Sequence, residues 1–215
     1  MLQPRPLPAD FYAEDTVETA HNLLGKLLVR RYGDELLAVR ITETEAYVGR
    51  MDKACHAYQY RRTRRTETLF APPGTAYIYL IYGMYHCLNF VTEPEGEPSA
   101  VLIRGGEAVL GKETMSQLRY GKEWSALTLY QRRNFLNGPG KLCKALALSR
   151  AQDGLPLTGP ELWVTDEAGL GLPPCQERRP VRTGKRIGID YAEEAADFPW
   201  RFYYGEKERD GNEAI

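Results

Sequence analysis

The sequence lacks the segments and motifs that would assign it to several large classes of protein. No stretch of its 215 residues approaches the run of about 18 apolar residues that a membrane-spanning helix needs, and the opening MLQPRPLPADFYAEDTV has no signal-peptide core. The glycine-rich and Walker motifs of nucleotide-binding folds and the G-x-S-x-G motif of serine hydrolases are also missing. We therefore expect a cytoplasmic protein that makes no contact with a membrane.

The cysteines are too few and too scattered for a disulfide framework or a zinc site. They are Cys55, Cys87, Cys143 and Cys175. None forms a C-x-x-C pair, so we expect reduced thiols. His56 and His86 each adjoin a cysteine, but neighbouring strand residues point to opposite faces and cannot share a metal ion. The sequence thus predicts no metal and no cofactor.

The net charge is small, but the basic residues are clustered. With 28 Lys and Arg against 29 Asp and Glu, the formal net charge is −1, which argues against a protein that coats nucleic acid by bulk charge. The first basic cluster is Arg61, Arg62, Arg64 and Arg65, and the second is Arg178, Arg179, Arg182, Lys185 and Arg186. One such cluster is typical of a solvated face, whereas two together predict a local anion-binding groove.

Apolar periodicity and turn signals predict an α+β protein with a single domain over 1–215 and flexible tails at 1–9 and 206–215. Asp15 is a candidate N-cap with Glu18 three residues later, which predicts a helix. The other expected elements are hairpins formed by 27–31 with 36–47 and by 77–81 with 85–91, helices near 112–118 and 138–148, and strands near 162–164, 185–189 and 201–204. Because hairpins dominate, we expect a mainly antiparallel curved sheet with flanking helices and a protruding β-hairpin.

One predicted strand carries carboxylates where its apolar row should continue. The row is Leu37, Val39 and Ile41, followed at the same spacing by Glu43, Glu45 and Tyr47. We predict that all six share the core-facing side of the strand. A buried carboxylate must be paired, protonated or used in chemistry, so this row marks a candidate site.

The second hairpin should carry large side chains at its tip. Tyr82, Gly83 and Met84 fall where the chain reverses, and glycine permits the turn. Strand tyrosines usually pack in a core, but a tyrosine and a methionine at an exposed tip gain nothing without a partner. Proteins that distort duplex DNA insert such wedges between bases.

Six blocks of the chain follow one another in an order typical of one enzyme family. They are ETEAY (43–47), DKACHAY (52–58), PPGTAYIYLIYGMYHCLN (72–89), VLIR (101–104), NGPGKLCKAL (137–146) and RIGI to WRFY (186–203). From residue 10 to 204 the chain resembles the 3-methyladenine or alkyladenine DNA glycosylase family. GMYHCLN and RRTRRTETLF are similar to its bacterial branch.

The resemblance implies a monofunctional DNA glycosylase that flips alkylated, and also deaminated, purines out of duplex DNA and hydrolyses the N-glycosidic bond, which starts base excision repair. It implies Glu45 as the general base for the attacking water, with Arg104 and the backbone carbonyl of Ile187 beside that water. Glu43 is expected to be structural. The implied partner is double-stranded DNA with damaged purines, bound by a monomer that acts at the bacterial nucleoid.

The resemblance also assigns residues to the flipped base and to the DNA. The base pocket would be formed by Tyr47, His56, Tyr79 and Asn89. The DNA contacts would be Thr63, Arg65, Tyr82, Gly83, Met84, Tyr85, Lys141 and Gly188. In this assignment Asn89 excludes the amino group of guanine, and Tyr82 fills the gap that the flipped nucleotide leaves.

Two other functions stay open at this point. A non-catalytic module that binds DNA lesions would keep the hairpin tip and the first basic cluster but would not need an acid at Glu45. A hydrolase of small nucleosides would use Glu43 and Glu45 but would need neither the tip nor the arginines.

Overall fold

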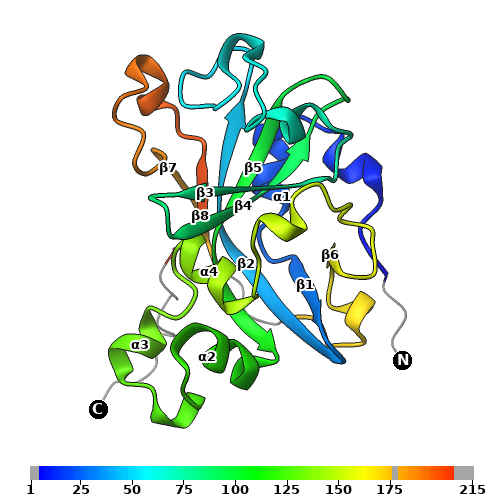
Figure 1. Cartoon of the computed structure of the whole chain (residues 1–215), viewed down its shortest axis with the longest axis vertical. Helices are drawn as coiled ribbons and strands as arrows, with labels where there is room; N and C mark the ends of the chain where they lie inside the picture. Colours follow the sequence, from blue (N-terminus) through cyan, green and yellow to red (C-terminus); the bar gives the residue numbers. More distant parts are fainter. Residues whose placement is uncertain (1–4, 176–178, 206–215) are drawn as a thin grey trace.

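The computed structural model describes residues 5–175 and 179–205, and a curled antiparallel sheet runs through its centre (Figure 1). The strands are β1 (Leu27–Tyr32), β2 (Glu35–Val48), β3 (Ala76–Ile81), β4 (Tyr85–Thr92), β5 (Ser99–Leu110), β6 (Leu162–Thr165), β7 (Val181–Gly184) and β8 (Arg201–Tyr204). The order is β3-β4-β5-β2-β1-β6, while β8 pairs with β2 and with β7. The predicted α+β architecture with a mainly antiparallel curved sheet is confirmed.

Short helices flank this sheet. They are α1 (Thr16–Asn22), α2 (Lys112–Tyr120), α3 (Leu129–Arg133) and α4 (Pro139–Ala145), with 3-10 turns at Ala9–Tyr12, Tyr58–Tyr60, Glu67–Phe70, Trp124–Ala126, Arg150–Gln152, Ala168–Leu170 and Glu193–Asp197. The Asp15 carboxylate accepts the N–H groups of Val17 and Glu18, as expected of the N-cap of α1. Pro139 opens α4 where its missing N–H costs nothing. No helix in the described ranges is long and apolar enough to cross a membrane.

The main core lies between the sheet and the helices α1, α2 and α4. Leu28, Ile41, Phe90, Ile103 and Leu142 are among its fully buried members. Burying one such side chain stabilises a fold by roughly 1.5–3 kcal/mol, so this cluster holds the sheet in its curled shape.

Two β-bulges face each other where β2 changes its partner. Ile41 pairs with Gly106 and Glu43 with Gly105, which leaves Thr42 as an extra residue on β2. Thr44 then pairs with Ile103, and this step leaves Arg104 as an extra residue on β5. At the same point the pairing of β2 with β1 ends and its pairing with β8 begins. Bulges bend strands and redirect side chains, and this pair redirects those of β2 and β5.

The bulge at Thr42 shifts the core-facing side of β2 by one residue. Ile41 packs in the main core before the bulge, and Ala46 does so after it. Between them, the buried hydroxyl of Thr44 donates to the carbonyl of Ala20 in α1. One inserted residue changes the alternation from odd to even positions.

The prediction that Glu43, Glu45 and Tyr47 continue the apolar row is therefore wrong. These side chains lie on the opposite face of β2 from Ile41. An unbroken alternation in the sequence hides the bulge, because the bulge depends on how β5 and β8 pair with β2.

The strand predicted at 185–189 is also wrong, since β7 ends at Gly184. Gly188 has a φ of +78°, which is outside the strand region. The N–H of Ile187 donates to the Glu45 carboxylate. The apolar residues of this segment thus serve a loop that closes over the end of β2.

Residues 1–4 and 206–215, which belong to the predicted tails, lie outside the described residues. Arg5 and Leu7 fall within the tail expected over 1–9, yet both are attached to β6. The Thr165 hydroxyl donates to the Arg5 carbonyl at 2.6 Å, and the Leu7 N–H donates to the Val164 carbonyl at 2.7 Å.

A buried ion pair fastens two loops to β2. The guanidinium of Arg186 donates to both carboxylate oxygens of Asp52, and both side chains are fully buried. It also donates to the carbonyl of Ala46 in β2 at 2.8 Å and to that of Ala195 at 2.9 Å. Asp52 belongs to the loop that carries His56, so one guanidinium joins both loops to the strand.

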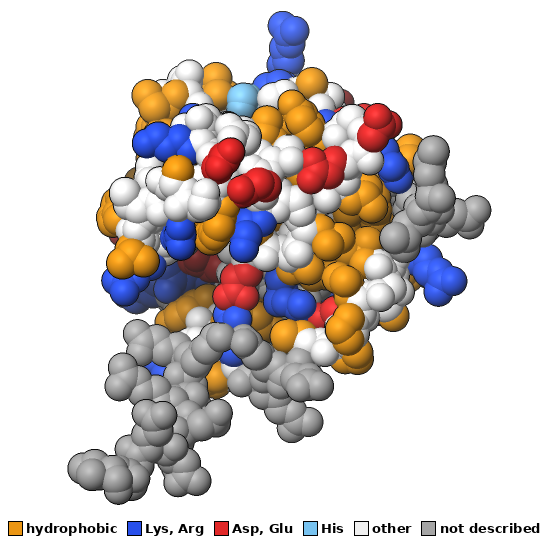
Figure 2. All heavy atoms as spheres, turned by 90° about the horizontal axis from the view of Figure 1, so that it is seen from below, with side chains coloured by type: hydrophobic (Ala, Val, Ile, Leu, Met, Phe, Trp, Pro, Cys, Tyr) orange, Lys and Arg blue, Asp and Glu red, His pale blue; other side chains and the backbone are white. Residues whose placement is uncertain are grey.

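The second basic cluster consequently does not form a basic face. Its member Arg186 is buried, and Arg178 lies outside the described residues. Arg179 pairs with Glu107, and Lys185 pairs with Asp197. Figure 2 likewise shows acidic and basic side chains interspersed over the face it presents. The sequence predicted an anion-binding groove lined by both basic clusters. That prediction is wrong for Arg186, because this side chain is buried.

We predict that Asp52→Asn lowers the free energy of unfolding by about 3–5 kcal/mol, because it leaves the buried Arg186 charge without a partner. Asp197→Asn is the matched control, since it breaks the exposed pair with Lys185 and should leave stability close to wild type. Urea denaturation of the three proteins measures both effects. Equal losses in the two variants would contradict a fastening role for the buried pair.

Candidate active site

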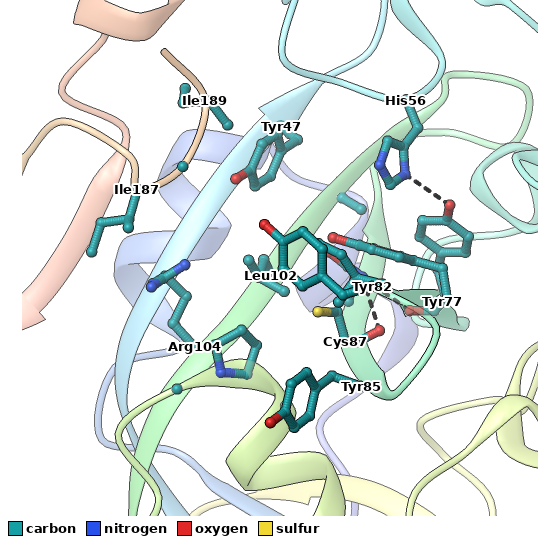
Figure 3. Close-up of a pocket in the computed structure, with 18 of the residues that line it drawn as sticks. Tyr47, His56, Tyr77, Tyr82, Tyr85, Cys87, Leu102, Arg104, Ile187 and Ile189 are labelled. Atoms are coloured by element: carbon teal, nitrogen blue, oxygen red, sulfur yellow. Dashed lines mark hydrogen bonds between the residues drawn. The ribbon is translucent and has the colours of Figure 1, made fainter. Parts of the chain in front are cut away.

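A cavity of about 680 Å³ opens on the face of the sheet to which Tyr47 points (Figure 3). Its aromatic lining residues are Tyr47, His56, Tyr77, Tyr79, Tyr82 and Tyr85. Arg119, Lys141 and Lys144 line it from α2 and α4. The cavity thus joins an aromatic part, suited to a flat ring, to a basic part, suited to an anion.

Glu45 is fully buried and lies behind three residues that line this cavity, Tyr47, Arg104 and Ile187. The Tyr47 hydroxyl donates to Oε2 at 2.6 Å and the Ile187 N–H donates to Oε1 at 2.8 Å. The Nε of Arg104 lies 3.3 Å from Oε1. Burial raises the pKa of Glu45 above its ordinary value, while Arg104, then Tyr47, then Ile187 lower it. The carboxylate is therefore dehydrated but well supplied with donors.

The structure brings together the three residues predicted for catalysis, with one difference. Glu45, Arg104 and Ile187 are in direct contact, but the contact of Ile187 is made by its N–H. The role of its carbonyl stays a prediction.

Glu43 holds Arg104 from the other side. The Nε of Arg104 donates to Oε1 of Glu43 at 3.1 Å, and Nη1 of Arg201 lies 3.5 Å from the same oxygen. The bulge in β5 directs Arg104 between the two carboxylates. Glu43 is only partly buried, so its position fits the predicted supporting role.

The aromatic wall opposite Tyr47 is built from β3 and the loop before it. The rings of His56 and Tyr79 lie edge to face at 4.6 Å, and those of Tyr77 and Tyr79 are 5.4 Å apart. The Nδ1 of His56 lies 3.0 Å from the Tyr77 hydroxyl oxygen. Burial, and secondly the charge of Arg65, lowers the pKa of His56 to about 4, so this ring is neutral at physiological pH.

Asn89 lies at the floor of the cavity and is buried. Its Nδ2 donates to the carbonyls of Tyr77 at 3.1 Å and Cys87 at 3.4 Å. Because both amide hydrogens have partners, Oδ1 is the atom left for a ligand.

The tip of the hairpin formed by β3 and β4 carries exposed side chains beside the mouth of the cavity. Tyr82 and Gly83 have φ values of +53° and +67°, and the Met84 N–H donates to the Ile81 carbonyl. These are features of a type I′ turn. Tyr82 is 81% exposed, and a non-glycine residue in this conformation costs roughly 1–2 kcal/mol. The fold thus keeps a tyrosine in an unfavourable backbone conformation at a position where most of its ring is exposed.

The other residues predicted to contact DNA are divided between the cavity and its surroundings. Tyr85, Lys141 and Gly188 line the cavity. Thr63 instead bonds to Thr66 within its own loop. The guanidinium of Arg65 lies 5.2 Å from the centre of the Tyr79 ring.

Sequence reasoning missed several residues of the site. Tyr77 could have been found, because it alternates with Tyr79 along β3. Arg119 and Lys144 could not, because only the folded chain brings α2 and α4 to the cavity.

Comparisons with known proteins agree on one family. A family model described as methylpurine-DNA glycosylase matches residues 10–208. The chain is 50% identical to a Clostridium perfringens protein over 92% of this chain and 94% of that protein. It is 49% identical to one from Alkaliphilus oremlandii, with the same coverage, and 47% identical to one from Bacillus cytotoxicus over 92% and 95%. All three relatives are named as a 3-methyladenine DNA glycosylase.

We predict that Glu45→Gln raises the melting temperature at pH 7 and that the gain disappears near pH 4. The pKa of Glu45 is raised in the folded protein, so the protonated side chain stabilises the fold. This stabilisation is full below the pKa of the unfolded chain and is lost as pH rises through the folded pKa, whereas the neutral glutamine does not titrate. Glu43→Gln is the control, since Glu43 is paired with Arg104 and Arg201 and its replacement should not stabilise. The measurement is the difference in melting temperature between Glu45→Gln and wild type at each pH. A difference that is smaller at pH 7 than at pH 4 would contradict the prediction.

Proposed function

The chain belongs to the methylpurine-DNA glycosylase family, and we propose that it removes alkylated purines, 3-methyladenine among them, from duplex DNA by hydrolysing the N-glycosidic bond. This reaction starts base excision repair. The observation that carries the proposal is the buried Glu45 carboxylate, which two hydrogen-bond donors and the Arg104 cation hold directly behind the lining of an aromatic cavity. A module that only binds lesions would gain nothing from a dehydrated carboxylate at that position.

The aromatic part of the cavity suits an alkylated purine. Tyr47 and His56 line the cavity from different elements (Figure 3), and Tyr79 lies against His56, so a flat base would stack between Tyr47 and this pair. A purine alkylated at N3 or N7 carries a positive charge, and electron-rich rings attract cations. Asn89 would act as the gate that excludes the amino group of normal guanine. Deaminated purines such as hypoxanthine would enter the same space by stacking alone.

Glu45 would act on a water molecule next to the flipped nucleotide. A carboxylate offers about four lone-pair sites; hydrogen bonds from Tyr47 and Ile187 occupy two of them, while Arg104 lies alongside as a charge. A free site on Oε2 would accept a hydrogen of the water that attacks C1′ of the deoxyribose. As the bond to the base breaks, the negative charge of Glu45 stabilises the oxocarbenium-like sugar, and Glu45 takes the proton of the water. The carbonyl of Ile187 would be the second acceptor for that water.

Arg104 would keep Glu45 ionised while it acts. Burial disfavours the charged carboxylate, and a fixed cation at 3.3 Å offsets that effect. Glu43 holds this cation in place without touching the water. The leaving base is already cationic when alkylated, so a single general base suffices.

The DNA would lie across the mouth of the cavity. Tyr82 at the hairpin tip would enter the gap left by the flipped nucleotide, with Gly83, Met84 and Tyr85 beside it. Lys141 and Gly188 at the rim, together with Thr63 and Arg65, would contact the backbone and fix the register without reading sequence. We propose that a monomer does this in the cytoplasm, at the nucleoid.

We predict that Glu45→Gln lowers single-turnover base release by a factor on the order of 100 or more, because the general base is lost. Affinity for DNA that contains the lesion should stay close to wild type, since the side chain does not touch the duplex. Incubation with 3-methyladenine and 7-methylguanine duplexes, followed by quantification of free base and abasic sites, measures this.

Glu43→Gln is the matched control and should lose less activity, because Arg104 keeps its contact with Glu45. Base release by Glu45→Gln at nearly the wild-type rate would refute Glu45 as the base. Absence of base release by the wild-type protein on every lesion, with binding intact, would instead indicate a lesion-binding module.

We predict that Tyr82→Ser weakens binding of a lesion duplex by roughly 1–3 kcal/mol, the usual value of one base–aromatic stack. The melting temperature should not fall, because the ring is exposed. Fluorescence of 2-aminopurine placed beside the lesion reports unstacking and should rise less with the variant than with wild type.

Tyr130→Ser is the control for the loss of an exposed tyrosine away from the cavity, since Tyr130 is 75% exposed on α3. A Tyr82→Ser protein that melts several degrees lower yet unstacks the probe normally would remove the wedge from the account.

A further inference from the structure

Arg65 lies against two residues of the aromatic wall, His56 and Tyr79. Its Nη2 is 3.4 Å from Nε2 of His56, and its guanidinium carbon is 5.2 Å from the centre of the Tyr79 ring. On the other side of the imidazole, Nδ1 of His56 lies 3.0 Å from the hydroxyl oxygen of Tyr77 (Figure 3). Both ring nitrogens of His56 therefore have a protein partner.

The chemistry of the guanidinium decides which nitrogen carries the hydrogen. Arginine has five N–H donors and no acceptor, so its contact requires a lone pair on Nε2 of His56. The hydrogen of the neutral ring must then be on Nδ1, from which it is donated to the Tyr77 oxygen. A protonated ring would place an N–H group against the guanidinium and repel it.

We propose that Arg65 is a positioning residue that holds His56 as the neutral tautomer with its hydrogen on Nδ1, so that the pocket wall presents an uncharged ring to the base. The consequence for specificity rests on the proposed function. An alkylated purine is cationic, and a protonated His56 beside it would oppose its entry by charge repulsion. A neutral ring can contact such a base without this penalty.

The groups around His56 support the assignment. Arg65 approaches from the loop of the first basic cluster, Tyr77 and Tyr79 approach from β3, and Cys55 adjoins His56 in the chain. Burial raises the pKa of both tyrosines and of the Cys55 thiol, so these groups are uncharged at physiological pH. Arg65 is thus the charged group that acts on the imidazole.

This role differs from the contact with the DNA backbone assigned above to Arg65. A phosphate contact operates only when DNA is bound, whereas the effect on His56 exists in the free protein. The two roles can be separated by an experiment without DNA.

The test is a ¹⁵N–¹H correlation of the imidazole groups in the free, full-length protein, followed over pH. In wild type, His56 should show hydrogen on Nδ1 alone and titrate with a pKa near 4. Arg65→Gln removes the charge but keeps an N–H donor, and the His56 pKa should rise, although burial will still hold it below its ordinary value. Arg65→Met removes the donor as well, and the resonances should indicate a mixture of both tautomers.

Arg64→Gln is the matched control, because it removes one arginine from the same loop and should leave the His56 titration unchanged. Unchanged resonances of His21 and His86 verify that each variant is folded. The proposal is overturned if wild-type His56 carries its hydrogen on Nε2, or if Arg65→Gln titrates as wild type does.

A second readout connects the tautomer to specificity. The rate of 7-methylguanine release, divided by that of neutral hypoxanthine, should fall more steeply on acidification from about pH 7.5 to 5.5 in Arg65→Gln than in Arg64→Gln. Comparing the two variants cancels the titration of Glu45 and of the leaving base, which both variants share. If the wild-type protein released no base, the proposed function would fail, whereas the imidazole resonances would still decide the role of Arg65.

Discussion

The site depends on keeping a negative charge at Glu45, whose side chain is fully buried. A buried carboxylate without partners would take up a proton and lose its value as a base. Two hydrogen-bond donors and one cation oppose this, namely the hydroxyl of Tyr47, the backbone N–H of Ile187 and the guanidinium of Arg104. The fold brings these three groups to the two carboxylate oxygens of Glu45.

Each group comes from a different part of the chain, and each is held by a distinct feature of the fold. The paired bulges at Thr42 and Arg104 turn the Glu45 carboxylate away from the main core. They also turn the Arg104 guanidinium toward that carboxylate. The buried contact of Arg186 with Asp52 fixes the loop that supplies the Ile187 N–H. The same guanidinium lies 4.7 Å from the centre of the Tyr47 ring, so it also supports the Tyr47 hydroxyl. Loss of one buried ion pair would thus loosen both hydrogen-bond donors to Glu45, the Tyr47 hydroxyl and the Ile187 N–H.

Local patterns in the sequence predicted the elements that depend on neighbouring residues. The N-cap at Asp15, the hairpin with Tyr82 at its tip and the pairing of β1 with β2 each follow from a few consecutive residues, and the structure confirms them. Strand β5 was not predicted, because Gly105 and Gly106 interrupt its pattern with weak strand residues. It nevertheless forms, since β2 and β4 pair with it on both sides.

The errors in the site have a common physical cause. The face of β2 to which Glu45 points depends on the bulge at Thr42, which arises because β2 pairs with strands distant in the sequence. The spacing of Glu45 from Ile41 therefore predicted the wrong face. Arg186 belongs to a basic run in the sequence, yet its carboxylate partner is 134 residues away and buries it. Residue types at the site were evident from the sequence, whereas their orientations required the folded chain.

The central claim is that water, activated by Glu45, displaces the base. Lys141 and Lys144 line the same cavity, so attack by a lysine amine is the alternative that must be excluded. The direct measurement is a single turnover on a 7-methylguanine duplex in ¹⁸O-labelled water, with borohydride added to a parallel sample. The account predicts free base, an uncut strand, one labelled oxygen at C1′ of the abasic site and no trapped protein–DNA adduct. A borohydride-trapped adduct, or strand cleavage that accompanies base release, would contradict it.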